Sequence, residues 1–259
     1  MTRHSSDEFY IGYAERAPIG TTRFVRRWVG IVAVVGVGVA AVVALTQQTF
    51  DDATFEFGQT RDFQGRIEAT PYPALLVPRP GSTDAALSVS RLHLVAQGKH
   101  GADDMVRAFD GQGGAAALSG TLIYRDDQTM IEVVPGSVEP APGSAGPAVT
   151  PTVEDLGTVT LRGEIVDSKC FLGVMNPATW TPHRACAVRC VSGGIPPMLV
   201  VRDSVGVLSY VLLADAQGRP IGKALLDVIA EPVEVTGRLE RRSGQLFLFA
   251  DRPSYRRIG

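Results

Sequence analysis

The chain has 259 residues, of which 45% are hydrophobic, and a formal net charge of −2 with a pI near 6.1. This balance lacks the basic stripe that nucleic-acid binding requires, so we expect no nucleic-acid partner. The cysteine count of three is odd. Internal pairing of all cysteines is therefore excluded, and at least one is a free thiol, a bridge to another chain or a metal ligand.

A long apolar run near the N-terminus, residues 28–45, contains no charged side chain. As a helix it spans about 27 Å, close to the thickness of a bilayer's hydrocarbon core. Arginines cluster directly before the run and acidic residues follow it, so the positive-inside rule places residues 1–27 in the cytoplasm. The sequence therefore predicts a transmembrane signal anchor over residues 28–46 in the inner (cytoplasmic) membrane, with everything after it in the periplasm or outside the cell.

The competing interpretation of this run is a signal peptide that is cleaved. Such peptides have an apolar region of about 7–15 residues that ends in a small-x-small cleavage site. The run here is longer, and Val43-Ala44-Leu45 is a poor cleavage site. We therefore favour an uncleaved single-pass anchor, which makes the membrane itself a partner.

A stretch rich in proline, glycine and alanine over residues 136–156 favours an extended linker. It separates two halves, 55–135 and 157–259, that repeat the same signals in the same order. Such repetition indicates tandem copies of one small domain. The matching segments are Phe63–Ile67 with Leu161–Ile165, Pro73–Val77 with Pro197–Val201, Gln97–Lys99 with Gln217–Arg219, Leu118–Leu122 with Val235–Leu239, and the turns at Asp126-Asp127 and Ser243-Gly244.

Each copy consists of short runs rich in Val, Ile, Leu and Thr that are bounded by Gly, Asp and Pro, a pattern typical of β-strands. Residues Val233–Glu240 alternate apolar and polar side chains, with Gly237 where a small barrel turns a corner. We predict a mainly β fold in which the N-terminal transmembrane helix is followed by two tandem OB-like small β-barrels, each five-stranded with Greek-key connections. Residues 222–229 would form a short helical connection before the last hairpin. A small open sandwich is the alternative.

All three cysteines lie in a segment of the second copy, residues 168–196, that the first copy lacks. Within it, Thr181 suits a helix N-cap and Pro182 suits the first helical position, while the glycine pair that follows would stop a helix. We therefore expect a short helix over residues 182–191.

The spacing of the polar residues on this helix points to a shared site. At 3.6 residues per turn, His183, Cys186 and Cys190 lie on one face. If Cys170, on the strand before the helix, is drawn to this face, three sulfurs and one imidazole converge.

Three kinds of chemistry fit this set, and the sequence leaves all three open. A disulfide from Cys170 to Cys186 or Cys190 would staple the insertion to the barrel and stabilise it by roughly 3 kcal/mol. A metal site of three cysteines and one histidine suits tetrahedral zinc, or copper or another soft metal with Met175 or Met198 nearby. A thiol-redox pair is the third, although C-x₃-C is not the C-x-x-C of thioredoxin-like proteins.

The second copy also resembles a group of small exported bacterial domains. These carry Asp-Ser-Lys-Cys, then His-x-x-Cys-x-x-x-Cys, then a Gly-Gly or Gly-x-Pro turn into a strand, and end in a Val-x-Val-x-Gly-x-Leu hairpin. In this chain the match covers roughly residues 159–250. The resemblance implies an exported, barrel-like fold and a motif made of Cys170, His183, Cys186 and Cys190, and it implies no particular activity.

Other candidate residues are better explained as structural. His93 lies in an alternating strand and His100 in a glycine-rich turn, while Gln97–Asp104 lacks the flanking strand and long helix of a phosphate-binding loop. No Ser, His and Asp set has a local nucleophile signature, so we do not expect an enzyme.

These observations together predict a non-catalytic accessory or binding subunit of a membrane-associated assembly, with a redox assembly favoured. Its partners would be other membrane or periplasmic protein subunits. The alternative is a metal-binding or thiol-redox protein that uses Cys170, His183, Cys186 and Cys190.

Overall fold

The chain divides into two compact units, Met1–Phe50 and Asp51–Gly259. The computed structural model describes residues 17–47, 53–79, 88–109, 114–141 and 151–258. In the first unit, helix α1 (Ile19–Thr46) has no buried residue and is long and apolar enough to cross a membrane. This fits a membrane anchor or a signal sequence, so the orientation and compartment of the barrels stay predictions.

Helix α1 starts earlier than the predicted span of 28–46. Residues 19–27, which we assigned to the cytoplasmic tail, form its first turns. They include Arg23, Arg26 and Arg27, and arginine has a high helix propensity. The helix therefore continues beyond the apolar run that predicted it.

Within the described residues, five strands close the first barrel. The elements are β2 (Arg61–Glu68), β3 (Ala74–Pro78), β4 (Val89–Val95), the short helices α2 (Asp103–Val106) and η2 (Arg107–Phe109), β5 (Ala115–Arg125) and β6 (Gln128–Val133), with β1 (Ala53–Phe55) and β7 (Glu139–Pro140) added alongside β5. Strand β2 pairs with β3, β3 with β4, β4 with β6, β6 with β5, and β5 returns to β2. The β4–β6 pair is parallel and the others are antiparallel.

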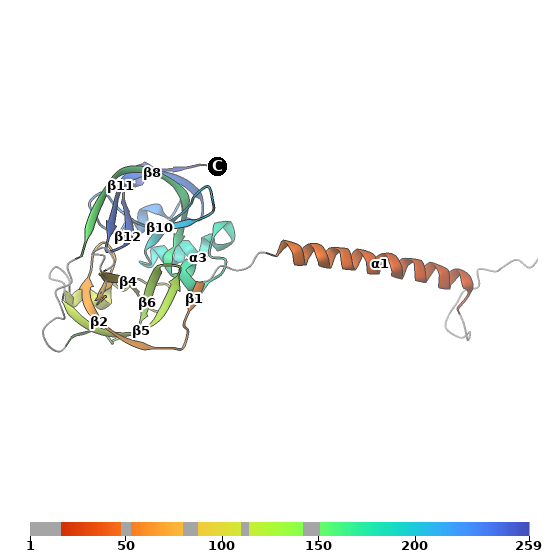
Figure 1. Ribbon diagram of the computed structural model, residues 1–259, viewed down its shortest axis with the longest axis horizontal. Helices are drawn as coiled ribbons and strands as arrows, with labels where there is room; N and C mark the ends of the chain where they lie inside the picture. Colours follow the sequence, from red (N-terminus) through yellow and green to blue (C-terminus); the bar gives the residue numbers. More distant parts are fainter. Residues whose placement is uncertain (1–16, 48–52, 80–87, 110–113, 142–150, 259) are drawn as a thin grey trace, which may run out of the picture. The chain divides into compact units, whose positions relative to one another are not determined.

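The second barrel repeats this path strand for strand. Its elements are β8 (Val153–Asp167), β9 (Pro197–Arg202), β10 (Leu208–Ala214), the 3-10 helix η4 (Gly222–Leu225), β11 (Pro232–Arg242) and β12 (Gln245–Phe249), followed by η5 (Arg252–Ser254) and β13 (Tyr255–Arg257). Strand β8 pairs with β9 and β9 with β10; β10 runs parallel to β12, which pairs with β11, and β11 returns to β8. The predicted mainly β fold with two tandem OB-like barrels is confirmed (Figure 1).

Two glycines predicted to correspond between the copies occupy matching places. A Cβ on Gly65 would lie 2.5 Å from the carbonyl oxygen of Leu76 on β3. A Cβ on Gly163 would lie 2.3 Å from the equivalent oxygen, that of Val200 on β9. Each barrel therefore needs glycine where its first strand crosses close to the next one.

The hairpins and turns of the two copies also correspond. Asp126 and Ser243, with φ of 50° and 46°, open the two-residue turns of the β5–β6 and β11–β12 hairpins, as expected for the turn type that matches strand twist. The turns after β4 and β10 are closed by matching bridges, Val95–Gly101 and Ala214–Pro220. Counted from the first residue of each bridge, the positive-φ glycine is the third residue on in the first turn, Gly98, and the fourth in the second, Gly218. Our alignment of Gln97–Lys99 with Gln217–Arg219 is therefore off by one residue.

Strand β8 begins at Val153, inside the stretch 136–156 that composition assigns to a linker. It stays paired with β11 from Val153 to Glu164 across a register shift. Gly157, with a φ of 79°, has the left-handed backbone that bulged strands use. Side chains at this end of β8 are mostly exposed, so no apolar alternation signalled the strand.

Each barrel has its own hydrophobic core, and a further buried cluster spans the two barrels. Ile123 and Met130 of the first barrel are buried in the same cluster as Phe171 and Phe247 of the second. Arg91 of β4 lies over the Phe247 ring, with its guanidinium carbon 5.5 Å from the ring centroid. The barrels therefore pack as one body, which allows a site to draw residues from both.

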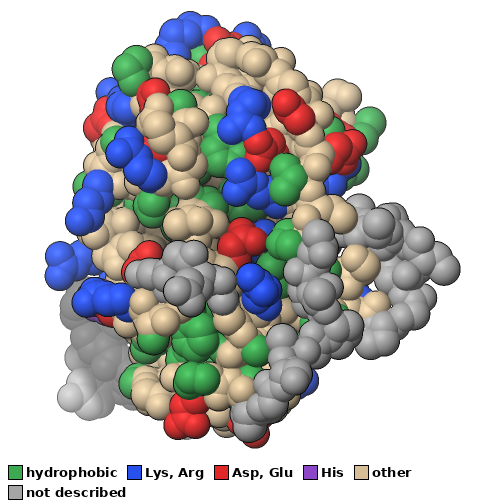
Figure 2. Space-filling view, turned by 90° about the vertical axis from the view of Figure 1, so that its left-hand side faces the viewer, with side chains coloured by type: hydrophobic (Ala, Val, Ile, Leu, Met, Phe, Trp, Pro, Cys, Tyr) green, Lys and Arg blue, Asp and Glu red, His purple; other side chains and the backbone are tan. Residues whose placement is uncertain are grey.

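The surface mixes charges of both signs. Figure 2 shows one face of the molecule, on which Lys and Arg side chains are interspersed with Asp and Glu. Exposed ion pairs of the second barrel include Arg162–Glu234 at 2.7 Å and Arg241–Glu154 at 2.5 Å. Each such pair contributes little to stability.

Replacing Gly163 by alanine tests the strand crossing. The new Cβ would overlap the carbonyl of Val200, a backbone group that is held by the β8–β9 pairing. We expect the free energy of unfolding to fall by about 1–3 kcal/mol, measured by chemical denaturation of the full-length protein in mild detergent. Thr158→Ala, at an exposed position of the same strand, is the control and should cost no more than about 0.5 kcal/mol. Equal losses for the two variants would contradict this account.

Candidate metal centre

The cysteines lie on an insertion that leaves the second barrel after β8 and returns at β9. It contains the π-helix η3 (Cys170–Val174) and helix α3 (Trp180–Ser192). The predicted helix over 182–191 is confirmed and is slightly longer at both ends. Ser168 donates its N–H to the carbonyl of Pro196 at 3.2 Å, which closes the neck of the insertion.

Helix α3 begins differently from the sequence prediction. Thr181 lies inside the helix, and the N-cap residue Thr179 makes no side-chain cap hydrogen bond. The N–H of Trp180 is instead bound by the carboxylate of Glu164 on β8. Trp180 has a φ of 59°, a strained conformation for a bulky residue. A contact with the barrel thus takes the place of a local cap.

The three sulfurs come together on this insertion. The Sγ of Cys170 lies 3.9 Å from the Sγ of Cys186 and 3.9 Å from that of Cys190, and all three cysteines are free. A disulfide needs about 2.05 Å between its sulfurs. Thiolates that bind one tetrahedral zinc ion at about 2.3 Å lie roughly 3.8 Å apart. The observed spacing fits both hydrogen-bonded thiols and the thiolates of one metal site, and both the metal site and the disulfide from Cys170 to Cys186 or Cys190 stay predictions.

Among the residues that the structure describes, two groups with metal-ligand geometry share Cys170. The first consists of Cys170, His183 and Cys186, and the second of Asp167, Cys170 and Cys190. Within each group the ligand atoms lie within 4.8 Å of one another. All four predicted ligands are in the cluster, but His183 and Cys190 fall in different groups. Asp167 is the member that sequence analysis missed, although it opens the Asp-Ser-Lys-Cys motif.

Asp167 orients two of the predicted ligands. Its Oδ2 lies 2.8 Å from Nε2 of His183, with both side chains almost fully buried. Its Oδ1 accepts the N–H of Cys170 at 2.9 Å. A carboxylate that holds one ring nitrogen of a histidine leaves the other for a metal ion and fixes the ring's direction.

Met175 is the methionine that reaches the sulfurs. Its Sδ lies 3.8 Å from the Sγ of Cys186, and its side chain is 43% exposed. Met198, the other methionine considered from the sequence, is buried in the surrounding core. A thioether beside several thiols is a donor set that suits soft metal ions.

A lysine of the first barrel points at the same cluster. Nζ of Lys99 lies 2.7 Å from the Sγ of Cys186 and 3.6 Å from that of Cys190. The hydrogen bond to Cys186 raises the pKa of Lys99 above its ordinary value, so the side chain stays an ammonium. In the sequence, Gln97–Asp104 has glycines but lacks the flanking elements of a phosphate-binding loop. No local signal links Lys99 with a cysteine 87 residues later.

The pKa values of the Cys170 and Cys190 thiols are shifted in opposite directions. The hydrogen bond between Cys170 and Cys190 lowers the pKa of the Cys190 thiol, and the ammonium of Lys99 acts in the same direction. The same hydrogen bond, together with burial, raises the pKa of Cys170. Binding of a metal ion to such a pair would release the remaining proton.

A second lysine fixes the turn that carries Lys99. The buried side chain of Lys169 donates from Nζ to the carbonyls of Ala96 at 2.9 Å and Gly98 at 2.8 Å. It also forms an ion pair with Glu132 on β6. Within the Asp-Ser-Lys-Cys motif, Lys169 therefore connects the two barrels, while Asp167 and Cys170 belong to the cluster.

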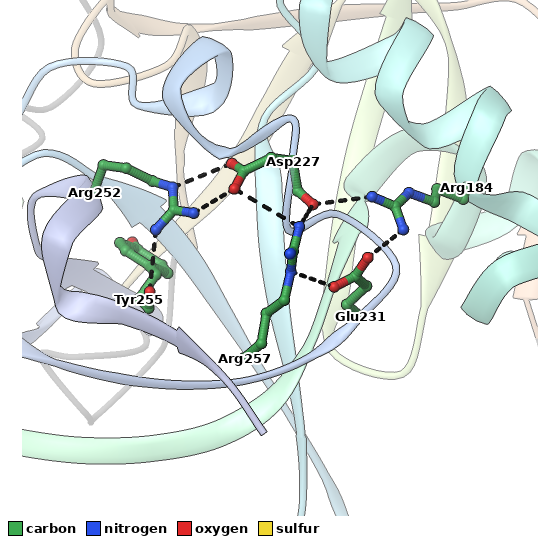
Figure 3. A network of polar contacts seen from close by, with 6 residues as sticks. All are labelled: Arg184, Asp227, Glu231, Arg252, Tyr255 and Arg257. Atoms are coloured by element: carbon green, nitrogen blue, oxygen red, sulfur yellow. Dashed lines mark hydrogen bonds and ion pairs between the residues drawn. The ribbon is translucent and has the colours of Figure 1, made fainter. Parts of the chain in front are cut away.

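A network of ion pairs ties α3 to the C-terminal segment (Figure 3). Arg184 on α3 pairs with Glu231 and donates to the carbonyl of Asp227 at 3.0 Å. Arg257 on β13 pairs with the same Glu231 at 2.5 Å, and Arg252 pairs with the carboxylate of Asp227. The last strand is thus connected to the residue that follows His183 on the helix.

Comparisons with known proteins do not assign this chain to a family. No protein family matches the chain, and no curated protein does. Among solved structures it is similar to a deletion mutant of the single-stranded DNA-binding protein from Thermus aquaticus, with 15% sequence identity and a TM-score of 0.22 over 78% of this chain and 97% of that one. The fold assignment therefore rests on the strand order described above.

Glu164 gives a pH-dependent test of the start of α3. Burial raises the pKa of Glu164 from 4.5 to about 7. Between these values the folded chain keeps a proton that the unfolded chain has lost, so the free energy of unfolding falls as the pH rises through this range. Glu164→Gln removes the titration. Relative to the parent, it should be more stabilising at about pH 8 than at about pH 4, measured by chemical denaturation.

Glu234→Gln is the control for this test. Hydrogen bonds from Arg256 and Arg162 hold the pKa of the exposed Glu234 below its ordinary value. Its loss should therefore be more destabilising at the higher pH, the opposite sign. A Glu164→Gln effect that does not change with pH would contradict the assignment.

Proposed function

We propose that this protein is a membrane-anchored accessory subunit that binds a metal ion, zinc or copper, at the cluster of Cys170, His183, Cys186 and Cys190. The observation that carries the proposal is the 3.9 Å separation between the Sγ of Cys170 and those of Cys186 and Cys190, beside a buried histidine. This spacing suits thiolates around one ion and is about twice the length of a disulfide.

The ligand types narrow the choice of metal. Sulfur and imidazole donors bind zinc, copper and other borderline or soft ions, whereas magnesium and calcium prefer oxygen. Cys170, His183 and Cys186 would supply three ligands, and Cys190 or Met175 is close enough to the group to supply a fourth. The ammonium of Lys99 would offset part of the negative charge of the thiolates.

The accessory role is supported by the membrane helix and by the surface of the insertion. Helix α1 is long and apolar enough for an anchor. Val174, Met175 and Trp180 are 36%, 43% and 53% exposed, and large apolar and aromatic side chains are enriched at the centres of protein interfaces. In this proposal the barrels lie on the periplasmic or outer side of the membrane, in an assembly for which a redox role is favoured.

Metal analysis of the full-length protein, purified in mild detergent under reducing conditions, tests the metal site. We expect about one zinc or copper ion per chain, because the two ligand groups share Cys170 and lie within one cluster. Cys170→Ser and Cys186→Ser should each lower the metal content at least about tenfold, since each removes a thiolate from the group that contains His183.

His100→Ala is the matched control, because His100 is exposed and lies outside the two ligand groups. It should leave the metal content unchanged. Parent protein that neither carries nor takes up zinc or copper would overturn the metal site. Peptide mapping that finds Cys170 disulfide-bonded in the parent would favour the structural staple in its place.

Chemical cross-linking in native membranes tests the accessory role separately. We expect a partner subunit to be captured at the insertion surface, and replacing Trp180 by serine should weaken the capture severalfold, because the exposed indole offers the largest contact area there. Val205→Ser, at an even more exposed apolar position on the β9–β10 turn, is the control. A protein that is recovered alone under all conditions would contradict the accessory role, and this result would leave the proposal of a metal site unaffected.

A further inference from the structure

The shortest contact in the cluster joins a nitrogen and a sulfur. Nζ of Lys99 lies 2.7 Å from the Sγ of Cys186, whereas the sulfurs are 3.9 Å apart. A distance of 2.7 Å is the lower limit even for hydrogen bonds between nitrogen and oxygen, and sulfur is the larger atom. The two side chains belong to different barrels, so the contact exists only in the packed pair.

The backbone that carries Lys99 is held against the insertion. Gly101 donates its N–H to the carbonyl of Gly193 at 3.0 Å. A Cβ on Gly193 would lie 2.0 Å from the carbonyl oxygen of Lys99, so glycine is needed for the two backbones to touch. Lys169 also holds this turn, through hydrogen bonds to the carbonyls of Ala96 and Gly98. These contacts fix the approach of Lys99 to Cys186.

We propose that Lys99 and Cys186 form a covalent nitrogen–oxygen–sulfur bridge, in which one oxygen atom is bonded to both Nζ and Sγ. The separation of 2.7 Å is too long for a direct nitrogen–sulfur bond. It is close to the span of two single bonds that meet at an angle at one oxygen atom. Little movement of either side chain is therefore needed.

Exposure and distance select Cys186 among the three cysteines. Cys186 is half-buried and Lys99 is exposed, whereas Cys170 and Cys190 are only 4% and 1% exposed. Oxidants react first with accessible thiols. In addition, the Sγ of Cys190 is 3.6 Å from Nζ, which a single oxygen atom does not span.

The oxidant in this step is molecular oxygen. One Nζ–H bond, the Sγ–H bond and the O–O bond break, while an N–O and an O–S bond form. The second oxygen atom leaves as water with the two hydrogens, and an ammonium that reacts gives one further proton to solvent. Sulfur and nitrogen each lose two electrons, and the oxygen molecule gains all four. Two equivalents of a dithiol would return lysine, cysteine and water.

The bridge would tie the first barrel covalently to the second and remove Cys186 from the set of metal ligands. Oxygen would thereby control both the contact between the barrels and the metal site. The loss of a ligand rests on the proposed function, whereas the bridge itself does not.

Intact-mass spectrometry of the full-length protein in mild detergent tests the bridge. After exposure to air we expect a species about 14 Da heavier than the reduced chain, because one oxygen is gained and two hydrogens are lost. Handling without oxygen, or treatment with a dithiol, should remove this species. Peptide mapping should show a cross-link between the peptides that contain Lys99 and Cys186.

Lys99→Arg keeps the positive charge and Cys186→Ser keeps the side-chain size, and both should abolish the heavier species. Lys223→Arg, at another exposed lysine, is the control and should retain it. A parent chain that stays at its reduced mass in air, or that only loses two hydrogens to a disulfide, would overturn the proposal. Metal analysis of the same samples separates the two ideas, since a bridged protein that never binds metal would refute only the proposed function.

Discussion

Backbone contact between the two barrels, at Gly101 and Gly193, is the constraint on which the cluster depends. Helix α3 ends at this point, and the N–H of Gly101 is satisfied by the carbonyl of Gly193. A side chain at Gly193 would push the barrels apart, because its Cβ would overlap the backbone of Lys99. The approach of the Lys99 ammonium to the thiols follows from this contact. The three thiols lie on the insertion of the second barrel, so the complete cluster, with its ammonium, exists only in the packed pair of barrels.

The duplication has produced two unequal copies of one barrel. Both have a turn of the same length after their third strand, closed by Val95–Gly101 in one and Ala214–Pro220 in the other. In the second copy the turn is paired within itself, since Arg219 binds Asp215 at 2.7 Å. In the first copy the turn reaches the other barrel. The first barrel thus supplies the turn that contacts the insertion, and the second barrel supplies the ligands on that insertion.

Features set by local pattern could be predicted from the sequence. Alternating strands, turn residues and the repeated glycines at Gly65 and Gly163 predicted the barrels, because sterics and side-chain periodicity act within a few residues. The spacing of His183, Cys186 and Cys190 predicted their shared helix face for the same reason. The geometry of one turn of helix needs no knowledge of the rest of the fold.

Features set by contacts between distant segments could not be predicted. Lys99 reaches Cys186 across 87 residues of sequence, and nothing near Lys99 marks it as part of a cluster. The predicted start of α3 was wrong in detail because Glu164, on another element, binds the N–H of Trp180, and the helix begins there, before Thr181. A comparison of short sequence signals also does not detect a one-residue shift in the place of a turn glycine, such as that between Gly98 and Gly218.

The order of the strands in the second barrel determines when its cysteines become enclosed during synthesis. Strands β11 and β12, which close that barrel, follow the insertion in the chain. The thiols therefore leave the ribosome before the second barrel can close. At about 5–20 residues per second this interval lasts several seconds. The first barrel, which carries Lys99, precedes the insertion in the chain and is therefore synthesised before it. If this barrel folds first, its Lys99 turn is a ready surface against which the insertion packs as the second barrel forms.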